Sequence, residues 1–117
     1  MGFWREEVIE FALDHETARH LEEQRAWIGR EPQNPQPFAN LAQLYRTQGR
    51  QDGALGLLLE AVRLDSSFAQ AHAALAEIYA VRGDTPAAWR HARLAEANGE
   101  SRAVDLLLRY GVPEKAE

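Results

Sequence analysis

Apolar residues recur along the chain at spacings of three and four, which is the spacing of one face of an α-helix. Within residues 34–98 one such pattern occurs twice, and the second copy follows the first by 34 residues. The shared residues are Leu41, Ala42, Tyr45, Gly49, Ala54 and Ala61 in the first copy and Leu75, Ala76, Tyr79, Gly83, Ala88 and Ala95 in the second. Identities at one fixed offset of this size indicate a repeat architecture.

Capping residues, prolines and glycines predict where the helices of both copies begin and end. Asn34 and Pro35 suit the cap and the first residue of a helix. Gly49 ends that helix, because glycine enters the left-handed conformation at little cost. A second helix starts near Gln51 and is apolar almost all round, as expected for a helix between two neighbours. The signals further along are Asp65-Ser66-Ser67, Gly83, Asp84-Thr85-Pro86, Asn98-Gly99, Ser101 and Gly111.

The N-terminal part, residues 3–30, contains no proline and favours helix. Its apolar residues are Trp4, Val8 and Phe11 in the first half and Ala18, Leu21 and Ile28 in the second. Each set forms one helical face, but the second face is rotated away from the first. A break near residues 14–17, with Asp14 as a cap, would realign them. We therefore predict two helices, about 3–14 and 16–29, and a single long helix is the alternative.

Composition and charge fit one small soluble domain. The chain has 117 residues, of which 45% are hydrophobic and 26% are charged, as is ordinary for a soluble globular protein. The net charge is -5, and most of it lies in residues 1–33. No part has the basic excess that nucleic acid or anionic lipid favours. Arginine supplies all but one of the 13 basic residues, so ionic recognition here would depend on guanidinium groups.

The chain contains no cysteine, which excludes disulfides, thiol catalysis and thiolate metal sites. No apolar run approaches the roughly 18–20 residues that cross a bilayer. Acidic residues appear by Glu6, where a signal sequence would be apolar. We recognise no catalytic triad, phosphate-binding loop or paired-carboxylate cleft. We expect a soluble, cytoplasmic protein, or a soluble piece of a larger one, with no enzymatic activity, no cofactor and no membrane insertion.

The repeated pattern resembles that of the tetratricopeptide repeat family. The matching residues of the first copy are Phe38, Leu41, Ala42, Tyr45, Gly49, Ala54, Leu58 and Ala61. This chain departs from the family at three places: His72 replaces the first aromatic residue of the second copy, Leu58 and Ala92 replace the aromatic residue of the second helix, and Ser66 replaces the proline between repeats. The small alanines allow paired helices to approach closely, and the two tyrosines fill the wedge between one pair and the next.

The resemblance implies an all-α fold, a right-handed α-solenoid of antiparallel helix pairs with about seven helices. Residues 1–33 would form a degenerate N-terminal repeat or capping helices, with Trp4 and Phe11 at family positions. Residues 34–98 would hold two full repeats, residues 99–112 a C-terminal capping helix, and residues 113–117 a frayed tail.

The resemblance also implies that the chain binds a peptide or a partner protein in a concave groove lined by the first helix of each pair. Carried onto this chain, the groove residues are Gln36, Ala39, Asn40, Gln43, Arg46, Gln70, Ala73, Ala74, Glu77 and Ala80, with Arg5 at the rim. This groove is rich in amides. Only Asn40 and Arg46 suit the grip on a terminal carboxylate that some members use, and Glu77 would repel an anion, so we expect no such clamp.

Other readings of the sequence stay open. Trp4, Val8 and Phe11 are candidates for self-association, which would make a homodimer, and the alternative is that Trp4 and Trp27 cap the core. Glu16, His20 and Glu23 share one helical face, and we favour an ion-paired surface over a metal site. We expect His72 to be a partly buried filler and His91 to belong to a surface cluster with Arg90 and Arg93.

Overall fold

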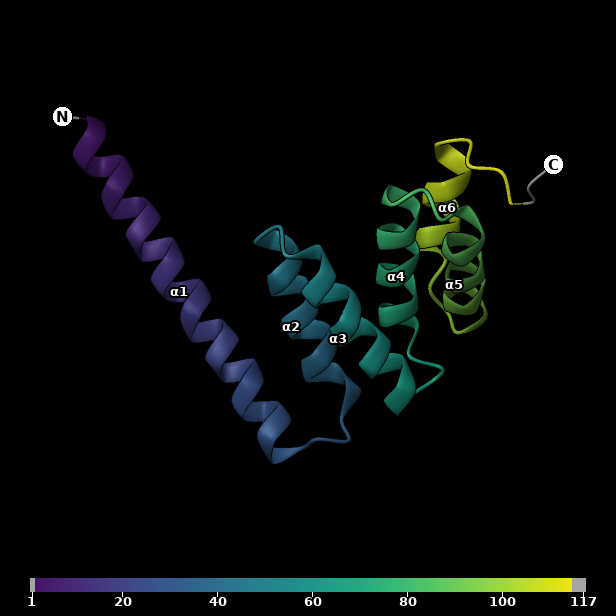
Figure 1. Cartoon of the computed structure of the whole chain (residues 1–117), viewed down its shortest axis with the longest axis horizontal. Coiled ribbons are helices and arrows are strands. Elements are labelled where there is room, and N and C mark those ends of the chain that lie inside the picture. The colour runs from purple at the N-terminus through teal and green to yellow at the C-terminus, as the bar shows by residue number, and fades with distance from the viewer. Residues whose placement is uncertain (1, 115–117) are drawn as a thin grey trace.

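The computed structural model describes residues 2–114, and it describes the side chains from residue 15 onward. The self-association candidates Trp4, Val8 and Phe11, and the rim residue Arg5, therefore have side chains outside the described part. The described residues form six helices and no strand (Figure 1). The helices are α1 (Gly2–Arg30), α2 (Pro35–Thr47), α3 (Gln51–Leu64), α4 (Ala69–Val81), α5 (Thr85–Ala97) and α6 (Arg102–Arg109).

The prediction of two N-terminal helices is wrong, because α1 is one continuous helix of 29 residues. Because α1 is a single helix, the described residues form six helices instead of the expected seven or so. α1 packs against α2, and its ribbon diverges from α2 toward the N-terminus (Figure 1). Leu21 is buried at 8% exposure, whereas Ala18 is exposed. A helix packed along part of its length needs no single apolar face from end to end, and residues 3–28 contain no proline or glycine to interrupt it.

Two helix pairs, α2 with α3 and α4 with α5, stack side by side and confirm the predicted all-α solenoid (Figure 1). The alanines shared by the two copies are completely buried, which brings the backbones of paired helices close together. Two clusters of buried residues follow from this stacking. The first contains Ala42, Ala54, Leu58, Ala61 and Leu75, and the second contains Ala76, Ala88, Trp89, Ala92 and Val104. Tyr45 and Tyr79 are partly buried against them, as expected for residues between neighbouring pairs.

The helix ends confirm the predicted side-chain caps at Asn34 and Asp84, whereas α4 and α6 begin without a side-chain cap hydrogen bond. The side chain of Asn34 accepts a hydrogen bond from the backbone N–H of Gln36, and that of Asp84 accepts one from Ala87. Each is followed by a proline in the first turn of its helix. Gly49 and Gly83 have φ values of 75° and 82°, in the left-handed region where only glycine is comfortable. These signals fix the hairpin ends.

Gly53 allows a close approach between the two helices of the first pair. A Cβ atom on Gly53 would lie 2.8 Å from Cδ2 of Tyr45, whereas one on Gly56 would meet nothing within 4 Å. The Tyr45 ring is held in place from two sides. Its hydroxyl accepts a hydrogen bond of 3.0 Å from Arg25 of α1, and the guanidinium of Arg50 lies 3.9 Å from its ring centroid. The Arg25 bond also lowers the pKa of the Tyr45 hydroxyl.

The C-terminal turn after α6 is tied to α5. The indole N–H of Trp89 donates a hydrogen bond of 3.2 Å to the carbonyl of Val112. Arg93, also on α5, pairs with Glu114 at 2.7 Å. Trp89 is buried at 3% exposure, so this tether starts from the core and holds the chain that follows α6 against the last pair.

His72 and His91 are both buried, and the expectation that His91 lies in a surface cluster is wrong. His91 is 8% exposed and His72 is 3% exposed, with their rings stacked at 5.3 Å between α4 and α5. His72 is also more than a filler with one hydrogen bond, since it contacts both His91 and the carbonyl of Ser66. The helical spacing of Ala88, His91 and Ala95 was the available signal for burial.

Candidate functional site

Four helices contribute side chains to one polar face. These are α1, the first helices α2 and α4 of the two pairs, and α6. Amides join the first three of them. The side chain of Asn40 donates to Gln24 of α1 at 3.2 Å and accepts from Gln36 at 2.9 Å, and Gln36 also donates to Gln70 of α4 at 3.3 Å. The predicted amides therefore form one connected chain across the face.

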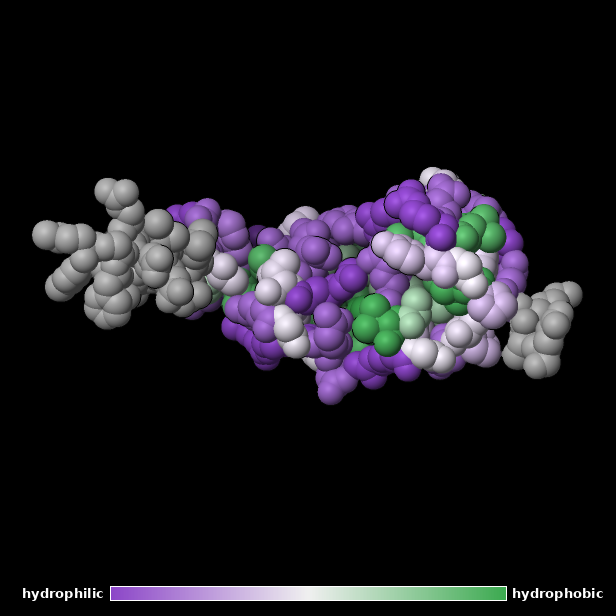
Figure 2. Space-filling view, turned by 90° about the horizontal axis from the view of Figure 1, so that it is seen from above, coloured by the Kyte–Doolittle hydropathy of each residue, from purple (hydrophilic) through white to green (hydrophobic). Residues whose placement is uncertain are grey.

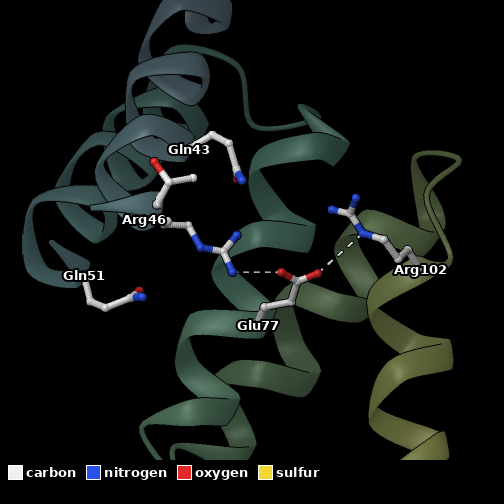
Figure 3. Close-up of a pocket in the computed structure, with 6 residues that line it drawn as sticks. Gln43, Arg46, Gln51, Glu77 and Arg102 are labelled. Carbon is white, nitrogen blue, oxygen red and sulfur yellow. Dashed lines mark hydrogen bonds and ion pairs between the residues drawn. The ribbon is translucent and has the colours of Figure 1, made fainter. Parts of the chain in front are cut away.

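The centre of the face is a cluster of two arginines around one carboxylate (Figure 3). Arg46 of α2 lies 3.0 Å from Glu77 of α4, and Arg102 of α6 lies 3.4 Å from the other oxygen of the same carboxylate. The side chains of Arg46 and Glu77 are only 23% and 20% exposed, whereas that of Arg102 is 58% exposed. Partial burial weakens solvent screening, so this pair is expected to hold its geometry better than a fully exposed one.

Connected cavities surround this cluster. One has a volume of about 390 Å³ and is lined by Gln43, Arg46, Thr47, Gln51, Glu77 and Arg102. A second, of about 240 Å³, shares Gln43, Arg46 and Arg102 with the first and has the small residues Ala39, Ala42 and Ala74 at its base. A third, of about 430 Å³, reaches His20, Glu23 and Gln24 of α1. Together they form a groove from α1 across α2 and α4 to α6.

The structure brings most of the predicted groove residues together. Those that line the cavities or join the amide chain are Gln36, Ala39, Asn40, Gln43, Arg46, Gln70, Ala74 and Glu77. Ala73 is different. It is completely buried in the cluster formed with α5 and α6, so its side chain does not reach the groove.

Among the groove residues that were not predicted from the sequence, Arg102 changes the site most. The sequence places it on the polar side of the last helix, and nothing in its spacing indicates that α6 turns this side toward Glu77. Its presence changes the role of Glu77, which was expected to repel an anion. Two guanidinium groups and one carboxylate give the cluster a formal net charge of +1.

The face that was weighed as a metal site has an ordinary surface pairing. Arg19 lies 3.9 Å from Glu23, four residues further along α1. Within residues 15–114 no group of three metal-binding side chains comes together. No helix in the described part of the chain is long and apolar enough to cross a membrane.

Comparison with known protein families shows which family this chain belongs to. The sequence model of the tetratricopeptide repeat matches residues 14–98, which is most of the chain and includes both copies of the pattern and the C-terminal half of α1. The chain belongs to the tetratricopeptide repeat family. Domains of this family generally mediate protein–protein interactions, and the family is typically non-enzymatic. Tetratricopeptide repeat arrays use the extended concave surface that stacked pairs create.

A relative among well-described proteins is similar over part of the chain. It is the TPR repeat-containing thioredoxin TTL4 of Arabidopsis thaliana, which is 41% identical over 64 residues. The match covers 55% of this chain but only 9% of that protein. The similarity therefore concerns only a small part of that protein's length.

Proposed function

We propose that this chain binds a peptide or a segment of a partner protein in the groove that runs from α1 to α6. The observation that supports the proposal best is the Arg46–Glu77–Arg102 cluster, which three different helices supply to one cavity. Groups that converge from separate helices on an open cavity are typical of a binding site. The amide chain beside them offers further donors and acceptors for a backbone.

The ligand that we propose is protein, and the role is binding rather than catalysis. The net charge of -5 disfavours nucleic acid, whose phosphates attract basic surfaces. The groove presents amides, two guanidinium groups and one paired carboxylate. Such groups bind and orient a ligand. We further propose a cytoplasmic location, which suits a chain without cysteine.

Blocking the groove tests this proposal. Gln43 lines all three polar cavities and is exposed, so Gln43→Trp would fill the groove without disturbing the core. The matched control is Leu59→Trp, at an exposed position of α3 that lines none of these cavities. Partners captured from source cells and identified by mass spectrometry should be lost with Gln43→Trp and kept with Leu59→Trp. Equal capture by both variants would show that the groove does not bind them.

The second candidate function is self-association through the N-terminal part of α1. The supporting observation is the divergence of its ribbon from α2 (Figure 1), together with Trp4, Val8 and Phe11 in the sequence. Light scattering across a concentration series tests it. A mass of 13.2 kDa that does not change with concentration would exclude it, and a mass that doubles and reverts in Trp4→Ala would support it.

A further inference from the structure

The polar cavity at the cluster continues into an apolar one. The apolar cavity has a volume of about 400 Å³ and shares Arg46 and Glu77 with its polar neighbour. Its remaining lining comes from the end of α4, from α6 and from the turn that Trp89 tethers: Ala80, Val81, Leu106, Leu107, Tyr110 and Val112. A ligand that reaches the cluster therefore has an apolar cavity within reach.

Two of these lining residues are large and unusually exposed. Val81 is 88% exposed and Tyr110 is 74% exposed. In Figure 2, apolar patches interrupt a face that is otherwise mostly polar. Exposed apolar surface that is rimmed by polar groups is characteristic of a site that a partner covers. The rim here is the arginine cluster, which indicates what kind of partner fits.

The cluster complements a carboxylate. Its two guanidinium groups share the single carboxylate of Glu77, which leaves one positive charge uncompensated. The shortest contact of Arg102 with Glu77 is made by Nε, at 3.4 Å, and Figure 3 shows its terminal nitrogens directed away from that carboxylate. A guanidinium with free terminal N–H groups binds carboxylates in a fixed, bidentate geometry. The unfilled half of this site therefore matches an acidic side chain of a ligand.

The geometry of α4 sets the spacing between the two subsites. Glu77 and Val81 are four residues apart on this helix, which corresponds to a rise of about 6 Å. In an extended segment, side chains two residues apart point to the same side and are separated by roughly 6.6 Å. In a ligand segment that lies along α4 at the α6 end of the groove, a carboxylate at the level of Glu77 and an apolar group at the level of Val81 therefore belong to residues two positions apart.

We propose that the groove selects an extended segment that carries an acidic residue two positions from a large aliphatic or aromatic residue. The acidic side chain pairs with Arg46 and Arg102, and the apolar side chain enters the cavity between α4 and α6. This inference rests on the proposed function and adds to it the two side chains that the groove recognises. The carboxylate is a side-chain group, so an internal segment of a partner is sufficient.

Selection from random peptides tests the inference. A phage library displays random dodecapeptides that are followed by further residues, so that the random segment has no free terminal carboxylate. The library is selected on the full chain, and the enriched clones are sequenced. We expect enriched peptides in which Asp or Glu stands two positions from Leu, Ile, Met, Phe or Trp. A representative peptide is then synthesised with acetylated and amidated ends, so that its side chain supplies the only carboxylate. Its affinity is measured by fluorescence anisotropy.

Paired variants separate the two subsites. Arg102→Gln should weaken binding about tenfold, the loss expected for one hydrogen-bonded charge pair, and should abolish the difference between the peptide and its Glu→Gln version. Arg109→Gln makes the same change on the same helix outside both cavities and should keep that difference. Val81→Asp should weaken binding of the peptide by disturbing the cavity for its apolar side chain. Leu59→Asp, at an exposed position of α3, should leave the affinity unchanged. Circular dichroism checks that each variant is folded.

Several outcomes would overturn the inference. Enriched peptides without the acidic and apolar pair would do so, and so would binding that needs a free terminal carboxylate or that survives Arg102→Gln unchanged. An absence of enrichment would also overturn it. None of these results decides whether the groove binds partners, since the capture experiment with Gln43→Trp answers that question independently.

Discussion

The Nδ1 atoms of His72 and His91 lie 3.0 Å apart in the interior of the second helix pair. Nε2 of His72 lies 2.8 Å from the carbonyl oxygen of Ser66, which can only accept a hydrogen bond. Nε2 of His72 therefore carries its proton, and Nδ1 accepts one from Nδ1 of His91. The pair is satisfied while both rings are neutral. Protonation of both rings would place two N–H groups face to face.

Stability should fall in acid because of His91. Burial, followed by the charges of His72 and Arg90, lowers the pKa of His91 from 6.5 to about 4. Below pH 6.5 His91 is protonated in the unfolded chain but stays neutral in the folded one. The free energy of unfolding therefore decreases as the pH falls toward 4. The loss should reach about 3 kcal/mol. Urea unfolding at several pH values measures it.

Two variants identify the source of that pH dependence. His91→Asn should flatten the acid side of the stability profile, because the group with the lowered pKa is gone. His20→Gln, on α1 and outside the core, should leave the profile as it is. Parallel profiles for wild type and His91→Asn would contradict the assignment.

Neighbouring leucines on α3 should differ sharply in their contribution to stability. Leu58 is 1% exposed in the first core cluster, and Leu59 is 41% exposed. Leu58→Ala should lower the free energy of unfolding by about 2–5 kcal/mol, because it removes buried contacts and leaves a cavity. Leu59→Ala should change it by less than about 1 kcal/mol. Chemical denaturation of both variants compares them directly, and similar losses would mean that α3 packs by another face.

Two glycines in the same helix should respond to alanine in opposite directions. Alanine favours helix over glycine by about 1 kcal/mol, and Gly56→Ala has open space for its methyl group. Gly56→Ala should therefore stabilise the fold. Gly53→Ala places a methyl group against the ring of Tyr45, and displacing that ring should cost about 1–3 kcal/mol. Melting temperatures that rise for both variants would show that Tyr45 yields easily.

Removing the central carboxylate should strengthen binding of acidic ligands. Glu77→Gln raises the charge of the cluster by one and leaves Arg46 and Arg102 free to bind a ligand carboxylate. The acidic peptide described above should bind about tenfold more tightly, with a steeper dependence on salt. The Glu→Gln version of the peptide is the control and should gain little. Anisotropy titrations at two salt concentrations measure both effects.

The helical repeats were predictable because local signals specify them. Asn34, Gly49, Gly83 and Asp84 act within one turn of their own positions, so the sequence alone determines the hairpin ends. The repeated alanines and tyrosines report packing between adjacent helices at a fixed spacing. These features required no knowledge of how distant elements meet.

The continuity of α1 and the role of Arg102 depend on how helices that are far apart in the sequence pack against one another. The rotated apolar faces of α1 suggested a break because the prediction assumed that the whole length is packed. Arg102 joins the groove because of the angle at which α6 packs on α4 and α5, and its own sequence context does not contain that angle. His91 was misplaced for a simpler reason, since its charged neighbours in sequence outweighed its helical spacing to the buried alanines.

The amides that connect α1 to α4 keep their mutual hydrogen bonds only if they turn over together. Gln70 offers its oxygen to Gln36, which in turn fixes Asn40 and then Gln24. Turning one amide over places like groups face to face at its neighbour, so the neighbour must turn as well. A ligand group that prefers the nitrogen or the oxygen of Gln70 thereby selects which atom Gln24 presents at the opposite wall. The amide orientations at the two ends of the groove are thereby coupled through side chains, without any movement of the backbone.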